Sequence, residues 1–180
     1  MDPPVHMLDF RRKANRLPRA SYRGRRLYFV TICAHKRKGV FTDSAIVNAA
    51  IGVLRETCRA HSFGVYAYCF MPDHVHLVLV GGEDSADLAL LIRAFKGAVV
   101  TAARAKNIPN LWQKGFYDHV IRSAEGLDRA AWYVLMNPVR AGLIKEPAEW
   151  PYSGSFMFDW KSLQAPSEPF APPWKKGVAR

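Results

Sequence analysis

Two histidines separated by one residue are the first sign of chemistry in this chain. His74 and His76 lie in the run MPDHVHLVLV at 71–80, where a Pro-Asp turn leads into aliphatic and β-branched residues that two glycines close. Successive side chains of a strand alternate between its faces, so both imidazoles of this predicted strand point the same way. Imidazoles at the mouth of an apolar strand need partners, and a shared metal ion would supply one. The alternative is a pair of half-exposed histidines without a ligand.

A tyrosine on a predicted helix adds a second reactive group. Arg129, Tyr133 and Asn137 recur at four-residue spacing, so a phenol and an amide project along one stripe. Alone, such a tyrosine would be a packing residue. Two histidines and a side-chain oxygen, however, form a small ligand set with open positions on Mg²⁺ or Mn²⁺, and a phosphate oxygen can fill one. The ion would stabilise charge on a phosphodiester while the tyrosine oxygen attacks it and forms a covalent intermediate.

The elements that position these groups follow from hydrophobic periodicity. Strands are predicted at 27–33, 63–70, 75–80 and 116–122, and helices over about 17 residues after the N-cap Asp43, at 85–107 and at 123–137. The two middle strands should pair as a hairpin, and Pro138 should stop the last helix. The order β-α-β-β-α-β, followed by a helix, predicts an α+β, ferredoxin-like fold with an antiparallel sheet and helices on one face.

Length and composition limit the organisation of the chain. Its 180 residues, 49% of them apolar, are enough for one hydrophobic core. We expect a flexible basic arm at 1–26, a catalytic domain at 27–145, and a tail with prolines and tryptophans at 146–180. Apolar runs fall short of the 18 or so residues of a membrane helix and no secretory signal is visible, which predicts a cytoplasmic protein. The three cysteines lack C-x-x-C spacing and are expected to be buried and reduced.

The charge distribution favours a nucleic acid partner. The formal net charge is +11, of which +6 falls in residues 1–26 and +3 in residues 160–180. A nearly neutral body with cationic arms is typical of nucleic-acid binders, whereas basic tails can also serve solubility alone. The candidate phosphate contacts are Arg11, Arg12, Lys13, Arg23, Arg25, Arg26, Arg93, Lys96 and Arg129.

Three segments taken together resemble the HUH single-tyrosine transposases. They are MPDHVH at 71–76, WQKGF at 112–116, and Tyr133 followed by NPVRAG at 137–142. Within that superfamily the chain is most similar to the REP-associated tyrosine transposases, which carry an Asn-Pro-Val segment of this kind and a C-terminal extension. The similarity covers residues 28–153.

The resemblance implies a ferredoxin-like core and a role for each matched residue. His74 and His76 would bind a divalent cation with Asn137 as third ligand, although the insertion-sequence branch more often has Gln at that place. Tyr133 would be the nucleophile, cleaving single-stranded DNA through a 5′-phosphotyrosine and leaving a free 3′-hydroxyl. The implied partner is hairpin DNA, REP palindromes included, bound by a monomer or a homodimer.

Two other hypotheses stay open at this point. A ferredoxin-like module could bind structured single-stranded DNA or RNA without chemistry, stacking bases on Tyr28, Tyr66 and Tyr68. The histidines together with Tyr133 argue against it, since a pure binder has no need of that set. A metal-dependent hydrolase that activates water would use no tyrosine and leave no covalent adduct.

Overall fold

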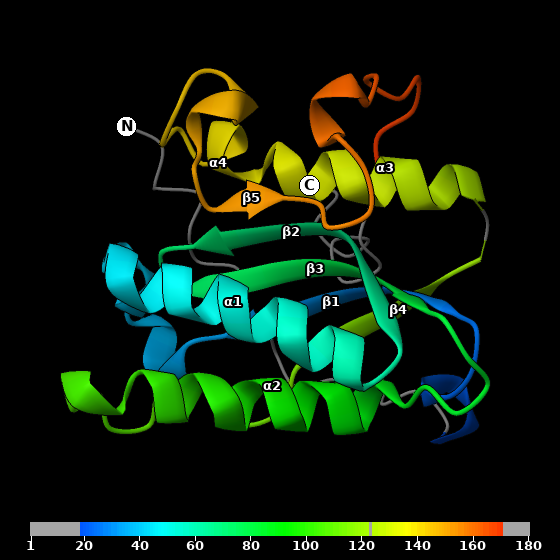
Figure 1. Ribbon diagram of the computed structural model, residues 1–180. Helices are drawn as coiled ribbons and strands as arrows, with labels where there is room; N and C mark the ends of the chain where they lie inside the picture. The colour runs from blue at the N-terminus through cyan, green and yellow to red at the C-terminus, as the bar shows by residue number, and fades with distance from the viewer. Residues whose placement is uncertain (1–18, 123, 171–180) are drawn as a thin grey trace, which may run out of the picture.

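A five-stranded antiparallel sheet with strand order β4-β1-β3-β2-β5 forms the centre of the molecule (Figure 1). The structure is a computed structural model that describes residues 19–122 and 124–170. The strands are β1 (Leu27–Cys33), β2 (Phe63–Met71), β3 (His74–Gly81), β4 (Tyr117–Ile121) and β5 (Ser153–Gly154). The α-helices are α1 (Ser44–Ala60), α2 (Leu88–Ala102), α3 (Ala124–Leu135) and α4 (Asn137–Arg140). Short 3-10 turns are η1 (Arg19–Tyr22), η2 (His35–Arg37), η3 (Val40–Thr42), η4 (Arg104–Lys106), η5 (Pro147–Glu149) and η6 (Trp160–Ser162).

The predicted hairpin is present and its register fixes the histidines. Met71 of β2 lies opposite His74 of β3, so Pro72 and Asp73 form the turn between the strands. On the other side of β3, Thr31 of β1 lies opposite His76. The histidines therefore lie at the start of β3, the central strand of the sheet.

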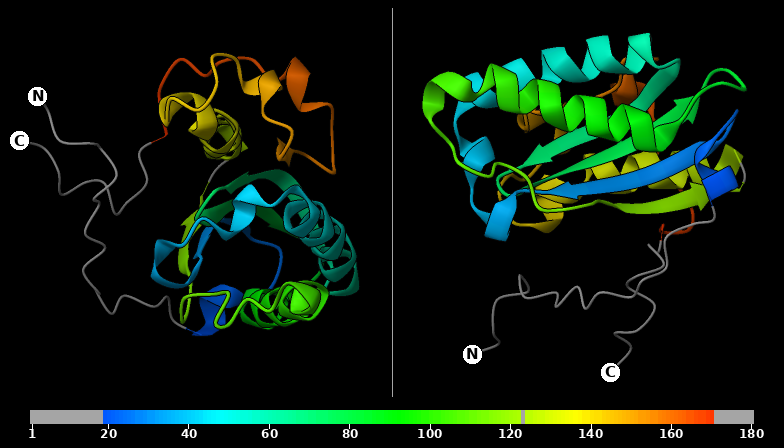
Figure 2. Two further views of the ribbon diagram at one scale, coloured as in Figure 1. Left: turned by 90° about the vertical axis from the view of Figure 1, so that its left-hand side faces the viewer. Right: turned by 90° about the horizontal axis from the view of Figure 1, so that it is seen from below.

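The predicted ferredoxin-like fold is confirmed, with both helices of the βαββαβ core on one face of the sheet and the additional C-terminal helix on the other. The helices α1 and α2, capped by Asp43 and Asp87, pack on the face that includes Leu77. The opposite face carries α3 (Figures 1 and 2). Its Val134 shares a second core with Val78, whereas the residues under α1 and α2 form the first core. Because strand side chains alternate, His76 lies on the α3 side together with Val78.

Two boundaries differ from the predicted ones for local reasons. The second helix begins after its cap Asp87 and ends at Ala102, inside the predicted range 85–107. Pro138 does not simply stop the third helix, because it occupies the first turn of the short helix α4. Proline is tolerated there, since the amides of a first turn have no partner within the helix.

The segments expected to be an arm and a tail also contribute to the body. Residues 1–18 and 171–180 lie outside the described part, but η1 packs with Tyr22 buried. In the tail, β5 pairs with β2 and the Trp150 indole donates to the Phe70 carbonyl at 3.0 Å. Cys33, Cys58 and Cys69 are buried and free, as predicted. Within the described residues, no helix is long and apolar enough to cross a membrane.

Gly81→Ala should lower the free energy of unfolding by about 1–3 kcal/mol. A Cβ at this position would lie 2.3 Å from the carbonyl oxygen of Gly24, a backbone atom that cannot swing away. The control is Gly52→Ala on an exposed part of α1, where a Cβ meets nothing within 4 Å. That change should raise stability by about 0.5–1 kcal/mol. Urea denaturation of both variants measures the difference, and equal stabilities would contradict the close approach at Gly81.

Candidate active site

The two histidine rings meet edge to face at the end of the hairpin. Their Nε2 atoms lie 3.1 Å apart and their ring centroids 4.6 Å apart at an interplanar angle of 82°. His76 is buried at 7% exposure, whereas His74 is partly exposed. The sequence prediction that both imidazoles share one face is confirmed.

Both Nδ1 atoms are held by neighbouring side chains. His74 Nδ1 is 2.6 Å from Asp73 Oδ1, and His76 Nδ1 is 2.8 Å from Thr31 Oγ1. Arg37 donates to the other Asp73 oxygen at 3.2 Å. Burial opposes ionisation of Asp73, but the hydrogen bond from His74 and the charges of His74 and Arg37 outweigh it and keep the pKa of this carboxyl below its usual value. With both Nδ1 atoms engaged, the Nε2 atoms are the ones directed at the shared space.

This spacing suits a divalent cation held by both rings. Two ligands about 2.1 Å from one octahedral ion at right angles are about 3.0 Å apart, which is close to the 3.1 Å between the Nε2 atoms. A metal-binding histidine generally engages its other ring nitrogen with a carboxylate, a carbonyl or another polar group, as both do here. The described residues contain no group of three or more His, Cys, Asp or Glu that could hold an ion, so further ligands would have to be of another kind.

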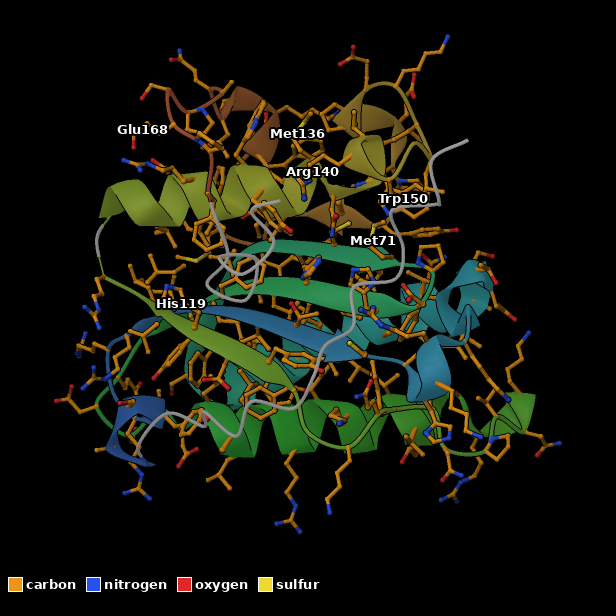
Figure 3. All side chains as sticks on the ribbon, turned by 180° about the vertical axis from the view of Figure 1, so that it is seen from behind. Met71, His119, Met136, Arg140, Trp150 and Glu168 are labelled. Atoms are coloured by element: carbon orange, nitrogen blue, oxygen red, sulfur yellow. The ribbon has the colours of Figure 1, made fainter. Side chains whose placement is uncertain are left out.

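Tyr133 of α3 faces the histidine pair across the second core. Its ring centroid lies 6.1 Å from that of His76 and 5.8 Å from that of Phe29. The guanidinium of Arg140 lies 3.9 Å from the centroid of the tyrosine ring and donates to the Tyr133 carbonyl at 2.8 Å. Figure 3 shows Arg140 above the end of the sheet where Met71 closes β2. Helix α3 thus delivers a phenol to the same end of the sheet as the two imidazoles.

Asn137 follows one helical turn after the tyrosine, at the start of α4. Its amide oxygen accepts from Arg140 at 3.2 Å, and its buried Nδ2 has no hydrogen-bond partner among the described residues. A buried donor without a partner is uncommon. An amide N–H binds an acceptor such as a phosphate oxygen and cannot bind a cation, whereas the Oδ1 atom that a cation would need accepts from Arg140. The role of Asn137 as third ligand stays a proposal.

The tail lies against the tyrosine. Phe170 stacks on Phe29 at 5.3 Å between centroids, and its ring lies 5.7 Å from Tyr133 and 6.4 Å from His119 of β4. Nearby, Glu168 pairs with Arg129 at 2.8 Å. In Figure 3, Glu168 lies on the outer side of α3, and His119 lies on the side of that helix that faces the sheet. The predicted phosphate contact Arg129 is therefore engaged within the chain.

The other predicted phosphate contacts are dispersed. Arg11, Arg12 and Lys13 lie outside the described residues. Arg23, Arg25 and Arg26 precede β1, at the opposite end of the sheet from the histidines, and the first two pair with Asp87 and Asp84. Arg93 is exposed on α2.

Lys96 has a structural contact. Its ammonium donates to the carbonyls of Gln113 and Gly115 at 2.7 and 3.0 Å, and burial lowers the pKa of this lysine. The Trp112 indole returns a hydrogen bond to the Lys96 carbonyl at 3.1 Å. The WQKG segment is thereby fixed against α2.

Comparison with known proteins identifies the family of this chain. The family model described as Transposase IS200 like matches residues 25–134. A REP-associated tyrosine transposase of Escherichia coli is 29% identical over 57% of this chain and 65% of its own. A Haemophilus influenzae protein provisionally given the same name is 30% identical over 79% of this chain and 86% of its own.

A solved structure shares the fold as well. It is described as the REP-associated tyrosine transposase bound to a REP hairpin, and it superposes with a TM-score of 0.63 at 24% identity, over 73% of this chain and 78% of the other. At that identity the likeness concerns the fold, whereas the family match rests on sequence along more than half of the chain. The chain belongs to the IS200-like transposase family, whose named relatives are tyrosine transposases.

Proposed function

We propose that this enzyme cleaves and rejoins single-stranded DNA next to a hairpin, in a reaction that depends on Mg²⁺ or Mn²⁺. One observation carries the proposal: Tyr133 lies beside His76, whose Nε2 is 3.1 Å from that of His74. A nucleophile and a cation site in such proximity suit phosphoryl transfer. The relatives named for REP palindromes support hairpin DNA as the substrate.

The chain's own residues perform most of the reaction in this proposal. The Tyr133 oxygen attacks the phosphorus, the bond to the 3′ oxygen breaks, and the products are a 5′-phosphotyrosine and a free 3′-hydroxyl. His74 and His76, with Asn137 as third ligand, hold the cation. When bound, the ion stabilises the negative charge that develops on the phosphate. Asp73 and Thr31 keep the two imidazoles in place through their Nδ1 atoms. We place this activity in the cytoplasm.

An adduct assay separates this function from its alternatives. Hairpin DNA labelled at its 3′ end is incubated with the protein and Mn²⁺, and the products are resolved on a denaturing gel. A labelled band that migrates with the protein and vanishes with EDTA supports the proposal. Cleavage fragments without an adduct would indicate hydrolysis by activated water. Binding without fragments would indicate a module that only binds DNA.

Deleting residues 1–18 should weaken DNA binding for all sequences alike. The segment contains Arg11, Arg12, Lys13 and Arg16, and the removal of each side chain that binds a phosphate should flatten the slope of log K against log salt by about 0.7 for single strands. The deletion spares η1, which packs on the body. Fluorescence anisotropy across a salt series measures both quantities. An unchanged slope and affinity would show that residues 1–18 serve solubility alone, and a lost base preference would show that they read the DNA sequence.

A further inference from the structure

A short loop after β1 is hydrogen-bonded to the turn that directly precedes His74. The Ala34 amide donates to the Asp73 carbonyl at 2.9 Å, and the Phe41 amide donates to the Pro72 carbonyl at 3.0 Å. Between these two bonds lie η2 and the residues that follow it. The loop therefore has a fixed position at the histidine end of the sheet.

The loop is strongly cationic and exposed. Lys36, Arg37 and Lys38 follow one another, and all three are exposed. Arg37 reaches back to Asp73, whereas Lys36 and Lys38 form no ion pair within the described part of the chain. The loop itself contains no acidic residue to offset them.

A fourth cation comes from the WQKG segment. The Gln113 amide donates to the Cys33 carbonyl at 2.9 Å, and the His35 amide donates to the Leu111 carbonyl at 2.9 Å. These bonds bring exposed Lys114 to the same end of the molecule. We call Lys36, Arg37, Lys38 and Lys114 the cationic cluster.

Two residues of the cluster hold a backbone conformation that suits glycine. Lys36 has φ 53° and ψ 27°, and Arg37 has φ 55°, both in the left-handed region. Residues other than glycine, asparagine and aspartate rarely adopt this backbone conformation. Such strained positions tend to occur where function requires them. Long cationic side chains stand here in place of the glycine that would fit more easily.

We propose that the cationic cluster binds the phosphate backbone of single-stranded DNA beside the cleaved bond, through Lys36, Lys38 and Lys114. This rests on the proposed function, because the strand that reaches Tyr133 must pass the histidine end. Exposed ammonium groups bind phosphates as point charges and do not select bases. Arg37 has a second task, since its contact with Asp73 links the cluster to the carboxylate that holds His74.

The test compares single variants that each remove one charge. Lys36→Gln, Lys38→Gln and Lys114→Gln are compared with the control Arg59→Gln, an exposed residue of the last turn of α1, toward the other end of the sheet. Affinity for a hairpin with a single-stranded flank is measured by anisotropy in EDTA across a salt series. Each cluster variant should weaken binding about 3- to 10-fold and lower the salt slope by about 0.7, and the control should change neither.

Neutralising single phosphates locates the contact. A methylphosphonate placed at each phosphate flanking the cleaved bond should weaken wild-type binding at one or two positions. At such a position, the lysine variant whose side chain contacts that phosphate should show no further loss of affinity, because the same charge pair has already been removed. Additive losses at every flanking position would overturn the proposal, as would cluster variants that bind like the control.

Two further measurements distinguish DNA binding by the cluster from a loss of folding and from a failure of the proposed cleavage reaction. Lys36→Gly relieves the left-handed backbone, so its melting temperature should equal or exceed that of the wild type while its affinity falls. A lower melting temperature with unchanged affinity would make Lys36 structural and overturn its part in the cluster. At saturating DNA the Lys→Gln variants should still form the Tyr133 adduct. If the wild type forms none, the proposed chemistry fails while the binding data still judge the cluster.

Discussion

Tyr133→Phe should abolish the protein–DNA adduct, lowering the cleavage rate at least about 10³-fold, while DNA affinity stays at the wild-type value. Only the nucleophilic oxygen is removed. The ring can still contact Phe29 and lie under the Arg140 guanidinium, so the packing of α3 on the sheet is kept. Adduct yield on a denaturing gel and anisotropy in EDTA measure the two quantities separately.

Tyr152→Phe is the matched control for this experiment. It removes the same atom from a partly buried tyrosine that packs on the first core, on the other face of the sheet from Tyr133. This variant should cleave and bind like the wild type. Cleavage by Tyr133→Phe at a rate near that of the wild type would eliminate the tyrosine mechanism and favour hydrolysis by activated water.

The fold was predictable wherever the signal was local. The bounds of β1 and the β2-β3 hairpin follow from β-branched runs and a Pro-Asp turn. In contrast, β5 has only two residues, too few for any periodicity, and its pairing with β2 depends on tertiary contacts. The placement of α3 opposite α1 and α2 does have a signal in the sequence. β1 is apolar on both faces in LYFVTIC, which is typical of a strand covered on both sides.

The residues of the site were likewise predictable only where the signal lies in neighbouring residues of the sequence. The histidine pair was predictable because residues two apart in a strand share a face, and Asp73 lies next to His74 in sequence. Thr31 comes from a strand 45 residues away, so only the register of β1 against β3 reveals it. A lone threonine in an apolar strand was the available hint. The contact of Arg140 with Tyr133 could not be predicted without knowing that Pro138 lies in the first turn of a new helix. That helix directs the Arg140 guanidinium back over the Tyr133 ring.

His74→Ala should remove cation binding and with it cation-dependent cleavage, a loss of at least about 100-fold. The residue lies partly exposed at the mouth of β3, so the fold should tolerate its removal. In the wild type, Mn²⁺ at 100 times its Kd should stabilise the protein by about 2.7 kcal/mol, which raises the Tm by roughly 5–10 °C. In His74→Ala that shift should vanish. Calorimetry and thermal denaturation without DNA measure it independently of activity.

His76→Ala should give the same loss of cation binding at a higher cost in stability. This ring is buried and contacts both Thr31 and Phe29, so its removal leaves a cavity and a hydroxyl without its partner. The control is His61→Ala, at the C-terminal end of α1, which should keep the full cation-induced shift.

Asp73→Asn should weaken cation affinity only in part, a result that a loss of folding would not produce. The carboxylate holds His74 Nδ1 at 2.6 Å without reaching the shared space itself, so its replacement should weaken cation affinity about 10- to 100-fold rather than abolish it. Raising the Mn²⁺ concentration by that factor should then restore cleavage in Asp73→Asn but not in His74→Ala. Cation binding that survives His74→Ala, or wild-type cleavage that persists in EDTA, would show that the ion does not bind between these two imidazoles.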